Sequence, residues 1–347
     1  MRDRELLVYN NICTDKLVSD MIYIMEGSPY DFLGSRDDAT GANGTDDVRN
    51  RAYGCVSRLM EFGAGHGISG NLWHHYLAML LVNDENAYSR ACEIVGHISG
   101  SIVDAVVHDM SIIREMFDYD FSVMKDKLGL TEWSFIEDYR ASSEESKVYN
   151  SRIRSRICEL TDRFESSNSA EEMKNSLTDF YREYGVGRFG LHKAFRVDRD
   201  HDGSVIIVPI LNIAHVKLDD LVGYEMAKKR LTDNTDAFVA GKKANNCLLY
   251  GDAGTGKSSC IKAIANEYFD RGLRVIEIYK HQFKDLNDVI AQIKNRNYKF
   301  IIYMDDLSFE DFEIEYKYLK AVIEGDLEKK PRNVLIYATS NRRHLIN

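Results

Sequence analysis

The chain has 347 residues, enough for about two domains, and its formal net charge is −10 at pH 7. Its content of 44% hydrophobic and 29% charged residues is typical of a soluble globular protein, and the acidic balance argues against non-specific nucleic-acid binding. No stretch of roughly 18 or more apolar residues occurs and the six cysteines form no C-x-x-C pair, so we expect no membrane span, no membrane partner, no zinc site and no disulfide framework, in a protein of the reducing cytoplasm.

Residues 1–185 are predicted to form a mostly helical N-terminal domain. A helix over 146–164 is indicated by apolar residues at steps of three and four, which are Tyr149, Ile153, Ile157, Leu160 and Phe164. A second helix is expected from about 170 to 184, with Ser169 and Glu172 as a capping box at its start and Gly185 at its end. The polar, glycine-rich segment 34–47 is interpreted as a mobile loop.

A β-hairpin linker is predicted for residues 186–217. Two strands, 191–197 and 204–210, flank the turn residues 198–203. This turn begins like an EF-hand calcium loop, but its twelfth position is Pro209 instead of glutamate and its flanks are strands, so a hairpin turn is favoured. The G-x-G-x-x-G match at 185–190 follows a helix, whereas a dinucleotide site needs a strand before it.

Residues 218–347 alternate strand-like runs with helical segments. The strand-like runs are 247–250, 274–279, 300–305 and 334–340. Such alternation predicts an α/β fold in which a parallel sheet is flanked by helices.

The run from Gly251 to Ser258 fits G-x-x-x-x-G-K-[ST], the phosphate-binding loop of nucleoside triphosphatases. It follows a short apolar strand and opens a helix, the context that the motif requires. The glycines allow backbone N–H groups to point at phosphate oxygens, Lys257 brings a positive charge, and Ser258 offers a hydroxyl to Mg²⁺. The nucleotide-binding residues predicted here are Gly251, Asp252, Ala253, Gly254, Thr255, Gly256, Lys257, Ser258 and Ser259.

Two carboxylates follow the apolar strand 300–304. Asp305 is expected to hold Mg²⁺, directly or through water, and Asp306 to orient or deprotonate the attacking water. The alternative is a buried strand followed by a charged turn. A further strand ends at Asn341, which we predict to help place the water beside the γ-phosphate; Thr339 and Ser340 are expected to point elsewhere, and a plain turn cap at Asn341 is the alternative.

Four stretches together resemble an uncharacterised bacterial family of predicted AAA+ ATPases, which is known as a domain of unknown function. They are 221–225 (LVGYE), 244–251 (ANNCLLYG), 305–310 (DDLSFE) and 338–345 (ATSNRRHL). The resemblance covers about 185–347 and implies a P-loop sheet in AAA+ strand order, with Leu221, Val222 and Gly223 near the adenine. It implies no particular substrate.

Two departures from the AAA+ pattern affect the expected chemistry. Position 306 is Asp where most AAA+ proteins carry Glu, and the side chain of Asp is one methylene shorter, which changes its reach toward the attacking water. The sequence also stops before the fifth strand, the arginine finger and the helical lid of a complete module, and Arg342 and Arg343 come too early to be the usual finger.

The sequence therefore predicts binding and Mg²⁺-dependent hydrolysis of ATP, coupled to remodelling or switching of an unknown protein partner. A homo-oligomer is expected of a complete module, and ATP is favoured over GTP because no N-K-x-D motif occurs. One alternative is a nucleotide-gated binding module with negligible turnover. Another is a nucleic-acid-associated accessory ATPase, supported only by the basic residues at 152–156 and 228–230. A small-molecule P-loop kinase is a more distant alternative.

Overall fold

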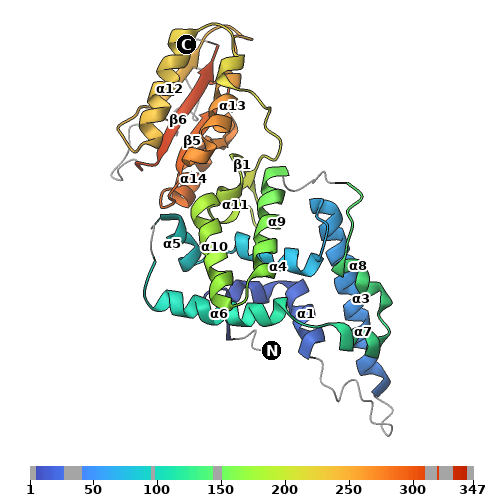
Figure 1. The fold of residues 1–347 in the computed structure, drawn as a ribbon. Coiled ribbons are helices and arrows are strands. Elements are labelled where there is room, and N and C mark those ends of the chain that lie inside the picture. The colour runs from blue at the N-terminus through green and yellow to red at the C-terminus, as the bar shows by residue number, and fades with distance from the viewer. Residues whose placement is uncertain are drawn as a thin grey trace. The chain divides into compact units, whose positions relative to one another are not determined.

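The computed structural model divides the chain into two compact units, Met1–Leu191 and His192–Asn347 (Figure 1). Across the helices that it describes, none is long and apolar enough to cross a membrane. The residues described are 5–26, 41–94, 98–143, 151–308, 319 and 331–341.

The first unit is helical. Its α-helices are α1 (Lys16–Glu26), α3 (Gly41–His66), α4 (Leu72–Asn83), α5 (Ala87–Ile94), α6 (Ser101–Phe117), α7 (Ser122–Leu128), α8 (Ser134–Glu137), α9 (Ser151–Ser166), α10 (Ala170–Tyr184) and α11 (Gly187–Leu191), with short 3-10 turns at Asn10–Thr14 and Thr131–Trp133.

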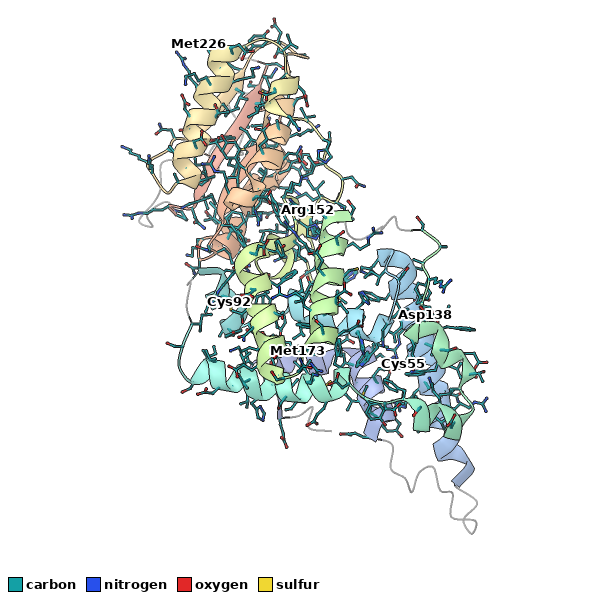
Figure 2. All side chains as sticks on the ribbon, in the orientation of Figure 1. Cys55, Cys92, Asp138, Arg152, Met173 and Met226 are labelled. Carbon is teal, nitrogen blue, oxygen red and sulfur yellow. The ribbon has the colours of Figure 1, made fainter. Side chains whose placement is uncertain are left out.

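Helix α10 lies at the centre of this unit and contacts α4, α5, α6 and α9. The Ser169 hydroxyl caps its start, as predicted, by accepting from the backbone N–H of Glu172. The reciprocal bond of the predicted capping box differs, because the Glu172 carboxylate accepts from the N–H of Asn168 at 2.7 Å. The helix ends at Gly185, whose φ is +83°. The buried side chain of Tyr181 donates to the carbonyl of Leu81 at 2.6 Å. Met173, on the same helix, is fully buried in this core (Figure 2).

A buried carboxylate fixes the start of the described chain to α6. Asp109 accepts hydrogen bonds from the backbone N–H groups of Leu7 at 2.9 Å, Val8 at 2.7 Å and Tyr9 at 3.0 Å. Its side chain is fully shielded from solvent. Because buried polar groups need partners, these three contacts hold residues 7–9 against the helix.

Two helices differ in extent from the sequence expectation. The predicted loop 34–47 is helical from residue 41 onward, where it forms the first turns of α3; residues 34–40 lie outside the described residues. Once Val48, Ala52 and Leu59 are packed in the core, each added residue gains a helical hydrogen bond, which offsets the weak propensity of the glycines. Helix α9 starts at Ser151, and the earlier part of the predicted helix 146–164 is also outside the described residues.

The second unit is built on a six-stranded sheet of order β2-β1-β4-β5-β6-β3. Among the strands in the described part of the chain, the β1–β2 pair is antiparallel and the other pairs are parallel, which confirms the predicted α/β class with a mostly parallel sheet. The strands are β1 (Ala194–Arg199), β2 (Val205–Pro209), β3 (Cys247–Tyr250), β4 (Leu273–Glu277), β5 (Lys299–Met304) and β6 (Val334–Ser340).

Within the described residues, the α-helices that flank this sheet are α12 (Glu225–Val239), α13 (Lys257–Glu267) and α14 (Leu286–Ile293); 3-10 turns occur at Leu218–Asp220, Phe269–Arg271 and Lys280–Asp285. Helices α12 and α13 share one core with alternate residues of the central strands, including Ile301, Tyr303, Leu335 and Tyr337. The intervening residues of β5 and β6 are buried as well, as expected for parallel strands covered on both faces.

The hairpin that was expected to link two domains is part of this sheet, because Ala194, Phe195 and Arg196 pair with β4. Its turn is closed by Asp200, whose carboxylate accepts from the N–H groups of Asp202 and Ser204. Strands flank the turn on both sides, as predicted for a hairpin.

Candidate functional site

The loop between β3 and α13 carries the phosphate-binding motif. Gly254 and Gly256 adopt φ values of +80° and +83°, a region that side-chain-bearing residues rarely enter. Gly256 is also the N-cap of α13, so the helix begins at Lys257 with its N-terminal N–H groups toward the loop. A helix N-terminus after such a loop attracts anions, because unpaired N–H groups and the helix dipole act together.

The ammonium group of Lys257 folds back over this loop. Its Nζ atom donates to the carbonyl of Gly251 at 2.7 Å, to the carbonyl of Asp252 at 2.8 Å and to Oδ1 of Asn341 at 3.0 Å. Three oxygen atoms therefore surround the charge.

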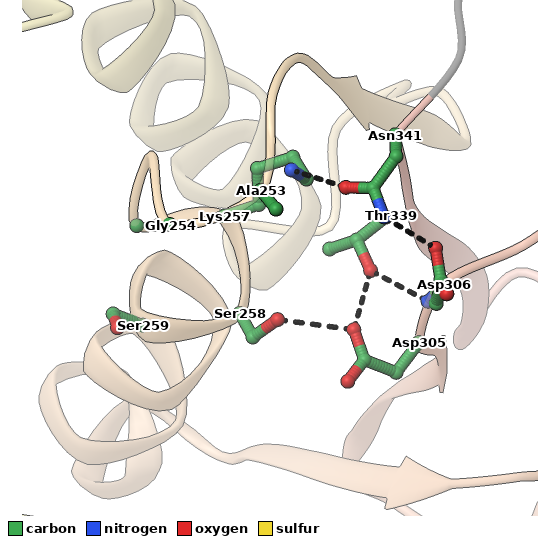
Figure 3. Close-up of a pocket in the computed structure, with 10 residues that line it drawn as sticks. Ala253, Gly254, Lys257, Ser258, Ser259, Asp305, Asp306, Thr339 and Asn341 are labelled. Atoms are coloured by element: carbon green, nitrogen blue, oxygen red, sulfur yellow. Dashed lines mark hydrogen bonds between the residues drawn. The ribbon is translucent and has the colours of Figure 1, made fainter.

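Three hydroxyl groups converge on Asp305, at the end of β5. Its Oδ1 atom accepts from Ser258 Oγ at 3.0 Å and from Thr339 Oγ1 at 2.5 Å (Figure 3). It also accepts from the Tyr303 hydroxyl at 2.7 Å. Partial burial acts to raise the pKa of Asp305, but these hydrogen bonds outweigh it and hold the pKa below its ordinary value. The carboxylate is thus ionised at neutral pH.

Asp306 has a left-handed backbone, with φ of +48°. Two contacts from β6 and its end hold it there: its N–H donates to Thr339 Oγ1 at 3.0 Å, and its Oδ1 accepts from the Asn341 amide at 3.0 Å. The same amide group contacts Lys257 through its oxygen, so Asn341 connects the phosphate-binding loop with the second carboxylate (Figure 3).

These groups share one cavity of about 340 Å³. Most of the predicted loop, metal and catalytic residues line it. The described residues of the lining are Ala253, Gly254, Gly256, Lys257, Ser258, Ser259, Asp305, Asp306, Thr339 and Asn341. The remaining loop residues Gly251, Asp252 and Thr255 line an adjoining cavity of about 600 Å³, which Lys257 also borders.

The residues expected near adenine, Leu221, Val222 and Gly223, are not among the described residues that line this second cavity. Leu221 is close to the loop, since a Cβ added to Gly256 would meet its Cδ2 atom at 4.0 Å. The Val222 side chain is 97% exposed. The cavity wall itself contains their neighbour Tyr224, together with Lys228 and Tyr250.

Sequence reasoning did not single out Tyr303, and it expected Thr339 to point elsewhere. The structure differs for Thr339, which lines the same cavity as Asn341 and donates to Asp305. Tyr303 lies two residues before Asp305, and its hydroxyl donates to that carboxylate. Arg342 and Arg343 lie outside the described residues.

Residues 190–347 match the family model described as "Protein of unknown function (DUF815)", which confirms the resemblance to an uncharacterised family for the C-terminal unit. Among curated proteins, the chain is similar to the "Replication factor C large subunit" of Staphylothermus marinus, with 36% identity over 74 residues, covering 21% of this chain and 17% of that protein. The same subunit from Methanococcus vannielii is 36% identical over 77 residues, covering 22% and 15%. The chain thus spans less than a fifth of the length of these relatives.

Two solved structures share part of the fold. DnaI is 24% identical, with a TM-score of 0.29, over 38% of this chain and 71% of that chain. A RuvB variant from Thermotoga maritima is 15% identical, with a TM-score of 0.30, over 38% and 43%. At these scores the likeness carries no argument about function. The fold rests on the strand order and the loop geometry described above.

Proposed function

We propose that the C-terminal unit, which has the AAA+ P-loop fold, binds ATP with Mg²⁺ and hydrolyses it. The observation that carries this proposal is the convergence of Lys257, Ser258, Asp305 and Asp306 on one cavity at a helix N-terminus. Two of these groups come from the loop and two from the end of a strand 47 or more residues later, so only the folded sheet brings them together.

The donor set at the cavity fits a magnesium ion. Ser258 and Asp305 supply a hydroxyl and a carboxylate oxygen, which are the hard ligands that Mg²⁺ takes alongside water and phosphate. The two oxygens already face each other at 3.0 Å. Bound there, the ion would neutralise charge on the phosphates during transfer.

The loop and Lys257 would bind the β- and γ-phosphates. In the present arrangement the Lys257 ammonium is satisfied by two carbonyls and one amide oxygen, all weaker acceptors than a charged phosphate. Phosphate binding would therefore draw Lys257 away from Asn341 while the N–H groups at the start of α13 hold the anion.

Asp306 would orient the attacking water and accept its proton, and Asn341 would position that water from the adjacent strand end. Their 3.0 Å contact keeps both polar groups at the same edge of the sheet. The base and ribose would extend toward the adjoining cavity, whose wall contains Tyr224, Lys228 and Tyr250. Leu221, Val222 and Gly223, which directly precede Tyr224, would lie near the adenine.

We further propose that the nucleotide cycle switches or remodels a protein partner and that the active form is a homo-oligomer, as expected of AAA+ modules. A module that binds nucleotide with negligible turnover is the alternative outcome of the same experiment.

The test is steady-state ATP hydrolysis by the full chain over a range of protein concentrations, with Mg²⁺-ATP binding measured in parallel. Turnover per subunit that rises with concentration and is lost in Lys257→Ala and Asp306→Asn would support an assembling ATPase. Binding that needs Lys257 without turnover at any concentration would identify the nucleotide-gated module. Wild-type protein that neither binds nor hydrolyses ATP would refute the proposal.

A DNA-associated role is the second candidate, favoured by the similarity to the large subunit of replication factor C. The net charge of −10 weighs against it. Duplex DNA binding that weakens steeply with salt, in the presence of ATP, would support this role, because phosphate contacts release counterions.

A further inference from the structure

Tyr303 occupies a core position of β5 yet carries a polar group. Its ring packs in the core shared with α12 and α13, and only 6% of the residue is exposed. A buried hydroxyl is unfavourable unless it is hydrogen-bonded, and this one donates to Asp305 Oδ1 at 2.7 Å. The Tyr303 hydroxyl is therefore a hydrogen-bond donor that reaches the carboxylate at the strand end from a position within the core.

Asp305 Oδ1 accepts more hydrogen bonds than it has lone pairs. Three hydroxyl groups donate to this atom, which has two lone pairs, and they belong to Tyr303, Thr339 and Ser258. Ser258 is the donor that a magnesium ion would take as its own ligand. Tyr303 and Thr339 belong to the sheet, and they would remain on Oδ1 when Ser258 leaves.

We propose that Tyr303 is a positioning residue for the magnesium site, whose hydroxyl fixes the rotation of the Asp305 carboxylate before the ion arrives. This inference rests on the proposed function. With one oxygen held from within the sheet, the carboxylate presents a preset orientation to the ion. Without that contact it must be ordered on binding, which weakens the affinity for the ion.

If Tyr303 only stabilised the core, removing its hydroxyl would have the same effect on the Mg²⁺ dependence as removing the hydroxyl of its neighbour Tyr337. The two residues are register partners on β5 and β6, and both are buried in the same core. The Tyr337 hydroxyl, however, contacts Thr235 at 2.9 Å and Asn234 at 3.0 Å on α12, away from the carboxylates. Tyr337→Phe removes the same atom from the paired position and is the matched control.

The experiment measures ATP hydrolysis by the full chain at saturating ATP while Mg²⁺ is varied. We expect Tyr303→Phe to raise the Mg²⁺ concentration for half-maximal rate roughly tenfold, because one hydrogen bond to a charged group is lost. The rate at saturating Mg²⁺ should stay within about twofold of wild type. Tyr337→Phe should leave the Mg²⁺ dependence unchanged, even where thermal unfolding shows a comparable loss of stability. Thr339→Val removes the second sheet donor and should shift the Mg²⁺ dependence in the same direction.

Equal Mg²⁺ dependence in Tyr303→Phe and wild type would overturn the inference while leaving the proposed ATPase intact. So would an equal shift in both phenylalanine variants. If the wild type binds ATP but does not hydrolyse it, the binding of a fluorescent ATP analogue is measured instead while Mg²⁺ is varied. Wild-type protein without Mg²⁺-dependent binding or turnover would refute both the inference and the function on which it rests.

Discussion

The side-chain oxygen of Asn341 accepts a hydrogen bond from Lys257 at 3.0 Å, although the two residues are 84 positions apart in the sequence. The amide nitrogen of Asn341 donates at the same time to Asp306. One neutral side chain thus contacts both the cation of the phosphate-binding loop and the carboxylate proposed to activate water.

We expect Asn341→Ala to lower kcat for ATP roughly 100-fold, because a group aimed at the reacting water is lost. The Kd for Mg²⁺-ATP should change by less than about threefold, since Lys257 keeps its charge and its carbonyl contacts. Single-turnover kinetics and equilibrium binding separate the two constants. A loss of affinity as large as that in Lys257→Ala would contradict this division of roles.

The left-handed backbone of Asp306 predicts an unusual ranking of variants. Asp and Asn tolerate this conformation better than longer side chains, so Asp306→Glu should destabilise the protein by about 1 kcal/mol relative to Asp306→Asn. Thermal unfolding checks the ranking, and Asp306→Gly, free of any Cβ restriction, serves as the control. Equal stability of the Glu and Asn variants would show that the backbone conformation carries no preference for a short side chain.

The hydroxyl of Thr339 makes two hydrogen bonds, because it donates to Asp305 and accepts from the N–H of Asp306. Thr339→Val keeps the shape but leaves both groups without this partner, and we expect a loss of about 1–3 kcal/mol in unfolding free energy together with reduced turnover. Thr339→Ser should restore most of both quantities. Urea unfolding and ATPase rates are the measurements; failure of serine to rescue would point to the methyl group instead.

In the helical unit, Asp109→Ala should cost about 3 kcal/mol, because three backbone N–H groups would lose their buried acceptor. Asp109→Asn retains one acceptor oxygen and should lose less. Both tryptophans of the chain, Trp73 and Trp133, are buried in this unit, so their fluorescence follows its unfolding. Glu115→Ala, an exposed change on the same helix, should stay within about 0.5 kcal/mol of wild type.

Stability of the second unit should fall in mild acid through His192. Burial, and then the positive charge of Arg274, lower its pKa from 6.5 to about 4. Between these values the unfolded chain binds a proton that the folded state does not, so this contribution is complete above about pH 6.5 and declines toward pH 4, by up to about 1.4 kcal/mol per pH unit. Hydrogen exchange of β4 at several pH values measures the slope, which His192→Gln should reduce. An unchanged slope in that variant would assign the acid sensitivity to other groups.

Local patterns were sufficient to predict the features that depend on neighbouring residues. The strand–loop–helix around Lys257 and the capping of α10 at Ser169 are examples, since period and cap chemistry are readable within a few residues. Features that depend on distant pairing were not accessible. Nothing near Phe195 indicates that it pairs with Ile276 of β4, and nothing near Gly41 shows that packing further along α3 makes it helical.

At the candidate site, too, some residues could be predicted from local sequence and others could not. The carboxylates at 305 and 306 stand out because two acids follow an apolar strand, whereas Tyr303 resembles any core aromatic until its hydroxyl is seen on Asp305. Strand alternation alone could have grouped Thr339 with Asn341. Which of several hydroxyls reaches a carboxylate depends on the register of β5 and β6, and a single sequence does not define that register.

The pairing of β1 with β4 decides where the chain can be divided for separate study. A fragment that begins at Leu218 would omit the hairpin and strip β4 of its neighbour on that side, leaving unpaired N–H and C=O groups along an apolar strand. Such edges recruit other chains, so that fragment would be prone to aggregate. A fragment beginning at His192 keeps the hairpin as a cover for this edge.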